Sequence, residues 1–217
     1  MRSALHRFIF CKERPEYLCL LAPLRLCLCA ILFFSFVGTK TTYADDVRTN
    51  PIIESGIQFF AGTAEKSLTG ARAYPLVFRA ESQRGSFRPS VSAEFLYAMG
   101  TASVASTSTA FTLYGGSFIP AYNVFIFKEG IFQPFFGFGG VVGWNYFKMT
   151  TPPTGVEGYT QGLSYGYSIT SGVDIRLGRT DGSAIRVSAN MLYLVSRIAG
   201  ISNFGLGGFR FMLGYVY

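Results

Sequence analysis

The sequence has little of what most enzymes and most soluble domains rely on. Histidine occurs once, at His6, and the four cysteines are Cys11, Cys19, Cys27 and Cys29. Charged residues make up 14% of the 217-residue chain, against about 25% in typical globular proteins. Only one stretch approaches the hydrophobicity of a membrane-spanning helix, and it lies near the amino terminus. The composition therefore indicates a membrane protein, whereas the pattern argues against helices.

These absences exclude several kinds of chemistry. Because His6 lies in the amino-terminal segment, the rest of the chain cannot assemble a Ser-His-acid triad or a histidine-ligated zinc site. It also lacks thiolate ligands and disulfides. Carboxylate pairs of the kind used in glycoside hydrolysis stay open, with Glu81, Glu94 and Asp174 as candidates. No motif marks these three, so we predict no enzymatic activity, no catalytic, cofactor-binding or metal-binding residue, and no cofactor.

The amino-terminal segment has the order of a secretory signal peptide. A basic region precedes the apolar core Cys27–Val37, and Thr42–Ala44 resembles a small-residue cleavage site. A membrane-anchoring helix over Tyr17–Val37 is the alternative, but a proline and an arginine inside that span disfavour it. We predict a signal peptide over residues 1–44 and a β-barrel over residues 45–217.

Removing the signal changes the charge balance. The whole chain has a formal net charge of +7, but six of its 19 basic and two of its 12 acidic residues lie in the first 44 positions. The remaining 13 basic and 10 acidic residues leave +3. A high isoelectric point is therefore partly a property of the signal, and we predict no nucleic-acid partner.

Beyond the signal, apolar residues recur with the period of two that is typical of half-buried strands. Leu163–Leu177 is the clearest case: its odd positions are mostly apolar or aromatic, and its even positions are small, polar or charged. Seven further segments can be read as strands. The eight predicted strands are Ile53–Ala61, Arg72–Ala80, Phe87–Met99, Thr109–Phe127, Phe132–Tyr146, Leu163–Leu177, residues 185–195 and Phe209–Tyr217.

The spacing of these segments predicts an all-β fold, an eight-stranded antiparallel up-and-down transmembrane barrel with both termini on its short-turn side. The phase of the fourth strand stays open around Gly115, Gly116 and Pro120, where a bulge could reset it. Long connections are expected at Gly62–Gly70, Gly100–Thr107, Thr150–Gln161 and Ala199–Gly205, and short turns at Gln83–Gly85, Lys128–Gly130 and Arg179–Gly182.

The composition of the polar face indicates which face of the strands lines the lumen and which faces the surroundings of the barrel. It consists mainly of Gly, Ser, Thr and Ala, which suits a narrow lumen better than a water-exposed surface. The apolar face is therefore predicted to contact lipid. The charges predicted to point inward are Arg79, Arg88, Arg176, Arg186, Arg210, Glu54, Glu81, Glu94 and Asp174.

Five positive and four negative inward charges nearly cancel, and buried charges are tolerated only when they are paired. We predict that Asp174 and Arg186 lie opposite each other across the hairpin that joins the sixth and seventh strands. The inward charges are interpreted as a salt-bridged plug. A gate whose pairs exchange and pass ions is the alternative.

Aromatic residues are expected to gather in two girdles, as they do at both interfaces of membrane barrels. The group toward the long-loop end comprises Tyr74, Tyr97, Trp144, Tyr146, Tyr165, Tyr167 and Tyr193, and the group toward the short-turn end comprises Phe87, Phe132, Tyr215 and Tyr217.

The signal peptide, the eight strands and the terminal segment Gly208–Tyr217 together resemble the small bacterial outer-membrane barrels of the OmpA/OmpX type. The terminal segment, with alternating apolar residues and a final aromatic, is similar to the signal read by the barrel-assembly machinery. The resemblance implies an outer-membrane location, with membrane lipids, lipopolysaccharide and that machinery as partners. We expect a structural or surface-facing role. A narrow channel, a carrier for small solutes or apolar molecules, and an adhesin are the alternatives, and the oligomeric state stays open.

Overall fold

The structure is a computed structural model. It describes residues 49–62, 68, 70–83, 85–104, 107–127, 129–152, 154, 158–178, 183–198 and 201–217. The signal peptide predicted over residues 1–44 and the turn predicted at Arg179–Gly182 lie outside the described residues, so both stay predictions. Within the described ranges, no helix is long and apolar enough to cross a membrane.

Nine antiparallel β-strands make up the described part of the chain. All of them except the five-residue β8 reach the 9–11 residues that a membrane-crossing strand needs, and the longest has 19 residues. They are β1 (Thr49–Phe60), β2 (Arg72–Ser82), β3 (Phe87–Val104), β4 (Thr107–Phe125), β5 (Phe132–Met149), β6 (Tyr159–Arg176), β7 (Ala184–Ile198), β8 (Ile201–Gly205) and β9 (Gly208–Val216).

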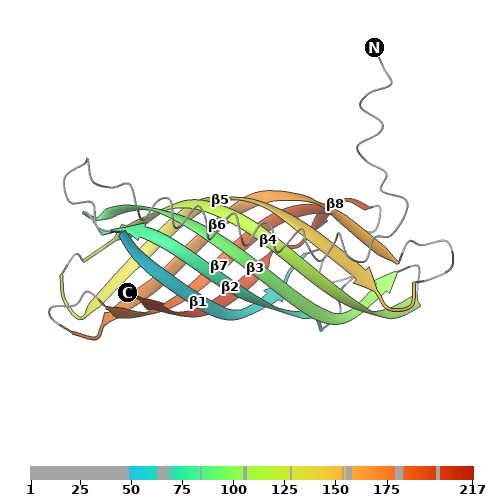
Figure 1. Ribbon diagram of the computed structural model, residues 1–217, viewed down its shortest axis with the longest axis horizontal. Coiled ribbons are helices and arrows are strands. Elements are labelled where there is room, and N and C mark those ends of the chain that lie inside the picture. Colours follow the sequence, from blue (N-terminus) through green and yellow to red (C-terminus); the bar gives the residue numbers. More distant parts are fainter. Residues whose placement is uncertain are drawn as a thin grey trace, which may run out of the picture. The chain divides into compact units, whose positions relative to one another are not determined.

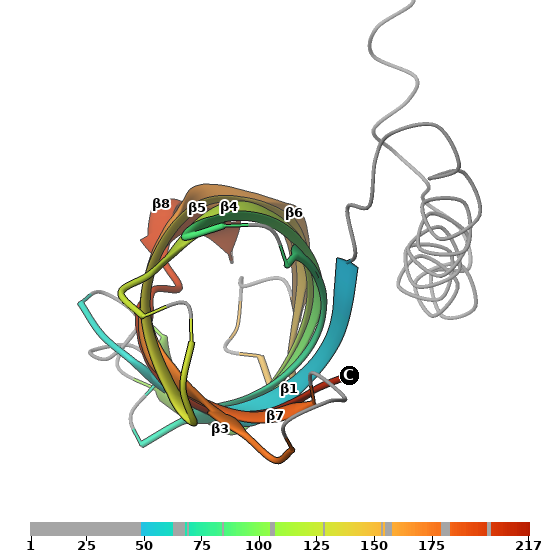
Figure 2. The same cartoon turned by 90° about the vertical axis from the view of Figure 1, so that its left-hand side faces the viewer.

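The strands close into a barrel of eight. Each strand from β1 to β7 pairs with the next, and β9 pairs with both β7 and β1, which completes the ring seen in Figure 2. The short strand β8 pairs with β7, and β9 continues this pairing in the same register: Val195 lies opposite Gly205, and Leu192 lies opposite Gly208. The strands β8 and β9 are therefore two halves of the eighth strand, and the predicted strand number is confirmed.

The two ends of the barrel differ in their connections. Figure 1 shows the carboxyl terminus at one end and β8 at the other. The first end, here called the turn end, joins β2 to β3 and β4 to β5 by short segments, and there Tyr217 N donates to Pro51 O over 3.0 Å. The opposite end, here called the loop end, carries the long connection from β1 to β2. The barrel therefore begins and ends on the short-turn side, as predicted.

The fourth strand keeps a single phase. Its register with β3 runs unbroken from Phe87 opposite Val124 to Val104 opposite Thr107. The ladder to β5 lapses at Pro120, which has no N–H to donate, but resumes in the same register. No bulge resets the strand, so its odd positions face inward throughout.

The long connection predicted at Gly100–Thr107 is wrong. There β3 and β4 continue as a paired hairpin, and only residues 105–106 separate them. The small and polar residues of this segment give no strong apolar alternation, but they form a backbone ladder, and Ala102 is buried. The connection predicted at Ala199–Gly205 likewise contains β8.

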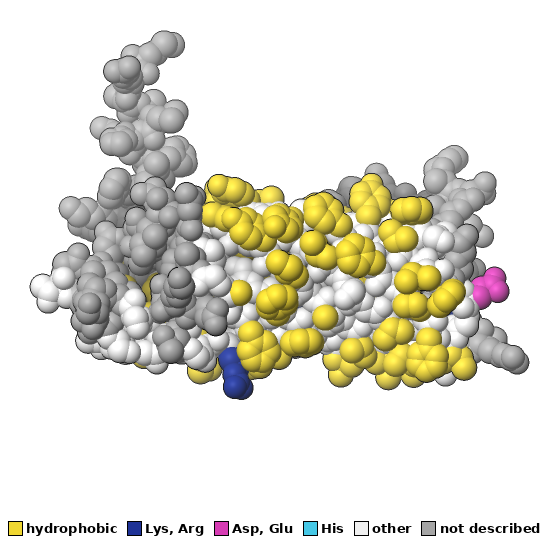
Figure 3. Space-filling view, turned by 180° about the vertical axis from the view of Figure 1, so that it is seen from behind, with side chains coloured by type: hydrophobic (Ala, Val, Ile, Leu, Met, Phe, Trp, Pro, Cys, Tyr) yellow, Lys and Arg dark blue, Asp and Glu magenta, His cyan; other side chains and the backbone are white. Residues whose placement is uncertain are grey.

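The exterior of the barrel is apolar. Large hydrophobic side chains at outward positions are extensively exposed, among them Leu163, Phe138, Phe211 and Leu213. In Figure 3, hydrophobic side chains cover the middle of the barrel, and charged side chains are visible only at the border of this hydrophobic band and at one end of the barrel. The predicted inside-out arrangement, with the apolar face of the strands turned outward, is confirmed.

Candidate functional site

The most heavily charged part of the molecule is the barrel interior. Arginines and carboxylates from β1, β2, β3, β6, β7 and β9 meet there with little exposure. The ion pairs are Arg79–Glu54, Arg88–Glu81, Arg186–Glu81, Arg186–Asp174 and Arg210–Glu94. Eight of the nine charges predicted to point inward are therefore brought together. The ninth, Arg176, is half-buried near the turn end.

Arg186 is the centre of the group nearer the turn end. It lies opposite Asp174 in the β6–β7 ladder, and its Nε and Nη2 atoms donate to Asp174 Oδ1 and Oδ2, both over 2.7 Å. The same guanidinium donates to Glu81 from across the lumen, with Nη2 2.9 Å from Oε1 and Nη1 3.2 Å from Oε2. The predicted Asp174–Arg186 pair is confirmed, and Glu81 makes it a triad.

Glu81 connects this triad to its surroundings. It accepts a hydrogen bond from Asn123 Nδ2 and lies 4.0 Å from Arg88 Nη1. Asn123 has room because Gly137 faces it from β5: a Cβ on Gly137 would collide with the Asn123 side chain. The glycines at Gly137 and Gly139 thus make space in a crowded lumen.

Aromatic rings also contact the cations of the triad region. The rings of Phe125 and Phe135 stack with centroids 5.2 Å apart. The Arg88 guanidinium lies 3.8 Å from the centroid of Phe125, and that of Arg186 lies 4.5 Å from the centroid of Phe135. Such cation–π contacts are strongest where water is excluded, so they add to the pairing of both arginines.

A second charged group lies near the middle of the barrel. Arg210 donates from Nη2 to Glu94 Oε1 over 2.8 Å and from Nε to Gln58 Oε1 over 2.6 Å. Arg79 lies 3.0 Å from Glu54 and donates from Nε to Ser92 Oγ over 3.0 Å. A cavity of about 30 Å³ lies between these pairs. That space suits one or two water molecules.

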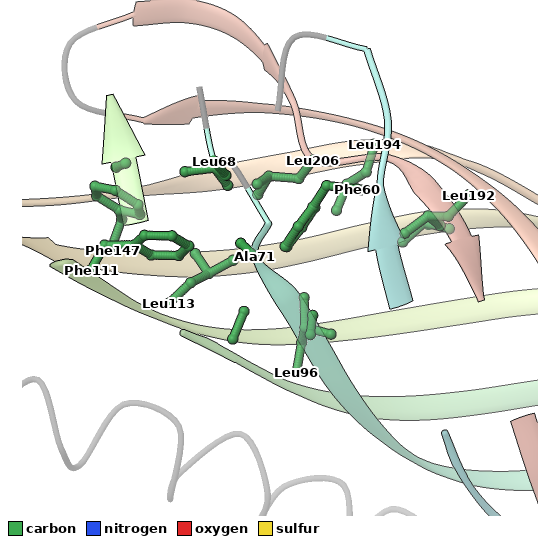
Figure 4. Packing of buried hydrophobic residues seen from close by; sticks show 14 of the residues in the cluster. Phe60, Leu68, Ala71, Leu96, Phe111, Leu113, Phe147, Leu192, Leu194 and Leu206 are labelled. Atoms are coloured by element: carbon green, nitrogen blue, oxygen red, sulfur yellow. The ribbon is translucent and has the colours of Figure 1, made fainter. Parts of the chain in front are cut away.

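The interior at the loop end is apolar instead. Figure 4 shows Phe111, Leu113 and Phe147, from strands β4 and β5, and Leu206, from the link between β8 and β9, pointing into one cluster inside the barrel. Phe111 and Phe147 stack with centroids 5.1 Å apart. Leu68, from the connection between β1 and β2, is buried in the same cluster. Along its axis the lumen therefore passes from ion pairs to a packed hydrocarbon layer.

Sequence reasoning missed this apolar layer, although a signal for it exists. Every second residue of a strand points to the same face. On β4, Asn123 points inward, so Leu113 and Phe111 do as well. On β5, Gln133 points inward, so Phe147 and Met149 do as well. The phase of the fourth strand stays open in the sequence, and the fifth strand is predicted to end at Tyr146, so none of these residues was assigned to a face. The alternation of positions along the strand, rather than the type of residue, therefore shows whether a side chain points into the lumen or toward lipid.

The carboxylates of the described lumen are held in ion pairs. The three carboxylates considered for acid–base chemistry, Glu81, Glu94 and Asp174, are all buried and bound to arginine. In the part of the chain that the structure describes, no group of three or more His, Cys, Asp and Glu side chains could hold a metal ion. The geometry fits a stiffened and filled barrel.

Comparisons with known proteins gave matches among solved structures. No protein-family model matches the chain, and no curated protein matches its sequence. The crystal structure of Neisserial surface protein A (NspA) matches with a TM-score of 0.54 at 12% identity, over 77% of this chain and 94% of that chain. The Yersinia pestis outer membrane protein Ail, in a phospholipid bilayer nanodisc, gives a TM-score of 0.43 at 16% identity, over 78% of this chain and 100% of Ail.

The closed antiparallel ring and the likeness to NspA define the class of fold. It is a closed eight-stranded antiparallel β-barrel like that of NspA, so the fold implied by the predicted resemblance to barrels of the OmpA/OmpX type is confirmed.

Proposed function

We propose that this chain is a non-enzymatic β-barrel protein of the bacterial outer membrane with a structural or surface-facing role. The observation that carries the proposal is the combination of an apolar exterior with a filled interior. The apolar side chains of the exterior can contact the hydrocarbon of a membrane, and the charged side chains of the interior neutralise one another in ion pairs. Export by the predicted signal, contact with membrane lipids and lipopolysaccharide, and folding by the barrel-assembly machinery belong to the same proposal.

The filled interior supports a role without catalysis. A substrate would have to displace buried charge pairs or the packed cluster around Leu113, because the cavity between the pairs holds about 30 Å³. Separating a buried pair costs about 3–5 kcal/mol. The lumen is therefore better suited to stiffening the barrel than to binding a reactant.

The same features weigh against a channel. An ion crossing the barrel would have to pass Arg186 and its two carboxylates, and then the apolar layer around Phe111 and Phe147. The ion would gain no ligand in that layer, and it would lose its hydration. We expect the wild-type barrel to be electrically silent.

Two measurements test this proposal. The protein expressed in bacteria should fractionate with the outer membrane and should migrate differently on a gel before and after boiling, as folded barrels do. In a planar bilayer it should give no unit conductance above that of a mock purification. Recovery in the soluble fraction would overturn the location, and steady ohmic steps would favour the channel alternative.

A further inference from the structure

Positive charge is in excess at one end of the lumen. In the group near the middle of the barrel, two arginines balance two carboxylates, and these four residues are Arg79, Arg210, Glu54 and Glu94. The described part of the group at the turn end has the arginines Arg88, Arg176 and Arg186, but only the carboxylates Glu81 and Asp174. The single uncompensated charge of the interior therefore lies at the turn end.

Arg176 is the arginine without a carboxylate. It is the last residue of β6, where it shares the inward face with Asp174, and it is half-buried. Both oxygens of Asp174 already accept hydrogen bonds from Arg186. Among the described residues, no carboxylate lies within ion-pair distance of Arg176. Its guanidinium can therefore be reached from the solution at the turn end, and it can accept a counter-charge from there.

Arg88 is only loosely paired. It is the second residue of β3, and its Nε atom donates to Gly85 O over 3.2 Å. Its Nη1 atom is 4.0 Å from Glu81 Oε1, which is longer than a hydrogen bond. One face of the guanidinium lies 3.8 Å from the centroid of Phe125, and the charges of two other arginines, Arg176 and Arg186, repel it. The terminal nitrogens of Arg88 can therefore donate to a further acceptor.

The two arginines meet at the opening of the barrel, here called the turn-end mouth and defined by Arg88, Arg176, Asn50 and Gln83. Arg88 on β3 and Arg176 on β6 are three strands apart in the ring, so they enter the mouth from well-separated parts of the wall. Gln83 donates a hydrogen bond to Asn50 at the same end. An eight-stranded barrel is filled by its own side chains, so the mouth admits only the thin end of a ligand.

We propose that the turn-end mouth binds the terminal carboxylate of a peptide that enters from the turn-end side. Guanidinium groups donate paired, charge-assisted hydrogen bonds to carboxylates. One carboxylate supplies the single negative charge that the turn-end group lacks, whereas a phosphate dianion would leave an excess of negative charge. The short turns of outer-membrane barrels face the periplasm, so the ligand is periplasmic, and this step rests on the location proposed above.

Titration of the folded protein, purified from the membrane in detergent, tests the inference. The probes are acetyl-trialanine, which has a free terminal carboxylate, and its uncharged carboxamide. In spectra of the isotope-labelled protein, the acid should shift the amide signals of Gly85, Arg88 and Arg176, and the carboxamide should not. Arg176→Gln should lower the affinity for the acid by about tenfold or more, because hydrogen bonds between charged groups are lost. Arg176→Lys keeps the charge without the fork and should lie between the two.

Stability gives a second readout. Since Arg176 has no carboxylate partner among the described residues, Arg176→Gln should leave the urea midpoint of the free barrel unchanged or higher. A ligand that binds only the folded state stabilises it, so the acid should raise the midpoint of the wild type but not that of Arg176→Gln. Arg72→Gln is the matched control, because it removes an exposed cation at the loop end and should change neither the affinity nor the midpoint shift.

Three results would overturn the inference. They are equal binding of the acid and the carboxamide, unchanged affinity of Arg176→Gln, and binding of the acid that appears only when Asp45→Asn and Asp46→Asn are combined. Asp45 and Asp46 lie outside the described residues and precede β1, so the third result would make the acidic pair of this chain the occupant. Each result can occur with a heat-modifiable barrel, which leaves the proposed function in place. Recovery of the wild type in the soluble fraction would instead contradict the proposed location.

Discussion

Arg186 is the most heavily bonded charge in the lumen, and its removal gives the sharpest test of the interior. Its side chain is 0% exposed and donates four hydrogen bonds to Asp174 and Glu81. Arg186→Ala leaves two buried carboxylates without their nearest cation. Breaking a buried pair costs about 3–5 kcal/mol, and we expect a loss near the upper value because two partners are stranded.

Asp174→Ala should be less harmful. The guanidinium of Arg186 keeps both of its bonds to Glu81, so the loss is that of hydrogen bonds to one charged partner, about 1.5–3 kcal/mol. The double variant removes both charges of the hairpin, and Glu81 then retains Asn123 and Arg88. Its loss should therefore fall short of the sum of the single losses by up to about 3 kcal/mol.

Urea unfolding from lipid vesicles, followed by the fluorescence of Trp144, measures all three variants. Ser188→Ala on the same inward face of β7 is the control, because it removes a neighbouring polar group without touching the triad. Strictly additive losses would show that Asp174 and Arg186 are not coupled. A loss for Asp174→Ala equal to that for Arg186→Ala would refute the bridging role of Glu81.

Three further predictions address the termini and the apolar layer. Amino-terminal sequencing of the membrane-bound protein should begin at Asp45, and retention of residues 1–40 would contradict the signal peptide. Deleting Tyr217 should lower the amount of heat-modifiable barrel in the outer membrane. It should change the urea midpoint of the refolded barrel little, because only one backbone hydrogen bond, to Pro51, is lost. A normal amount of barrel in cells would count against a role of Tyr217 in assembly. Leu113→Ala, at a 0% exposed interior position, should lower the free energy of unfolding by about 2–5 kcal/mol. Leu213→Ala, 62% exposed toward lipid, should lower it by clearly less, and equal losses would mean that the interior is not packed there.

Local alternation was sufficient to predict the strands and the faces of most of them. In Leu163–Leu177 the contrast between the two faces is strong, so the segment gives both the strand and its inward side. The Asp174–Arg186 pair followed from the same alternation, because a short hairpin fixes which residues of its two strands lie opposite each other. Predictions of this kind need no knowledge of the rest of the barrel.

Contacts across the lumen could not be predicted in this way. Glu81 and Arg186 are 105 residues apart, on strands that are not neighbours in the ring. Parity places both side chains inside, but their relative depth depends on the accumulated register of every strand between them. The alignment of the outward-facing Tyr74, Tyr97, Tyr114 and Tyr146 has the same origin, since each of its three pairings belongs to a different strand interface.

The layering of the interior explains why residue type was a partial guide to the inside of this barrel. At the turn end, charges such as Arg186 and Asp174 mark the inner face, because an unpaired charge in lipid would be costly. At the loop end both faces carry large apolar side chains, and leucine is as acceptable at Leu113 inside as at Leu163 outside. There the face is determined by the continuity of the strand, which cannot shift by one residue without turning the buried charges of the other half toward lipid. The ion pairs of the turn end therefore fix the orientation of the whole wall, including the part at the loop end whose interior is the apolar cluster.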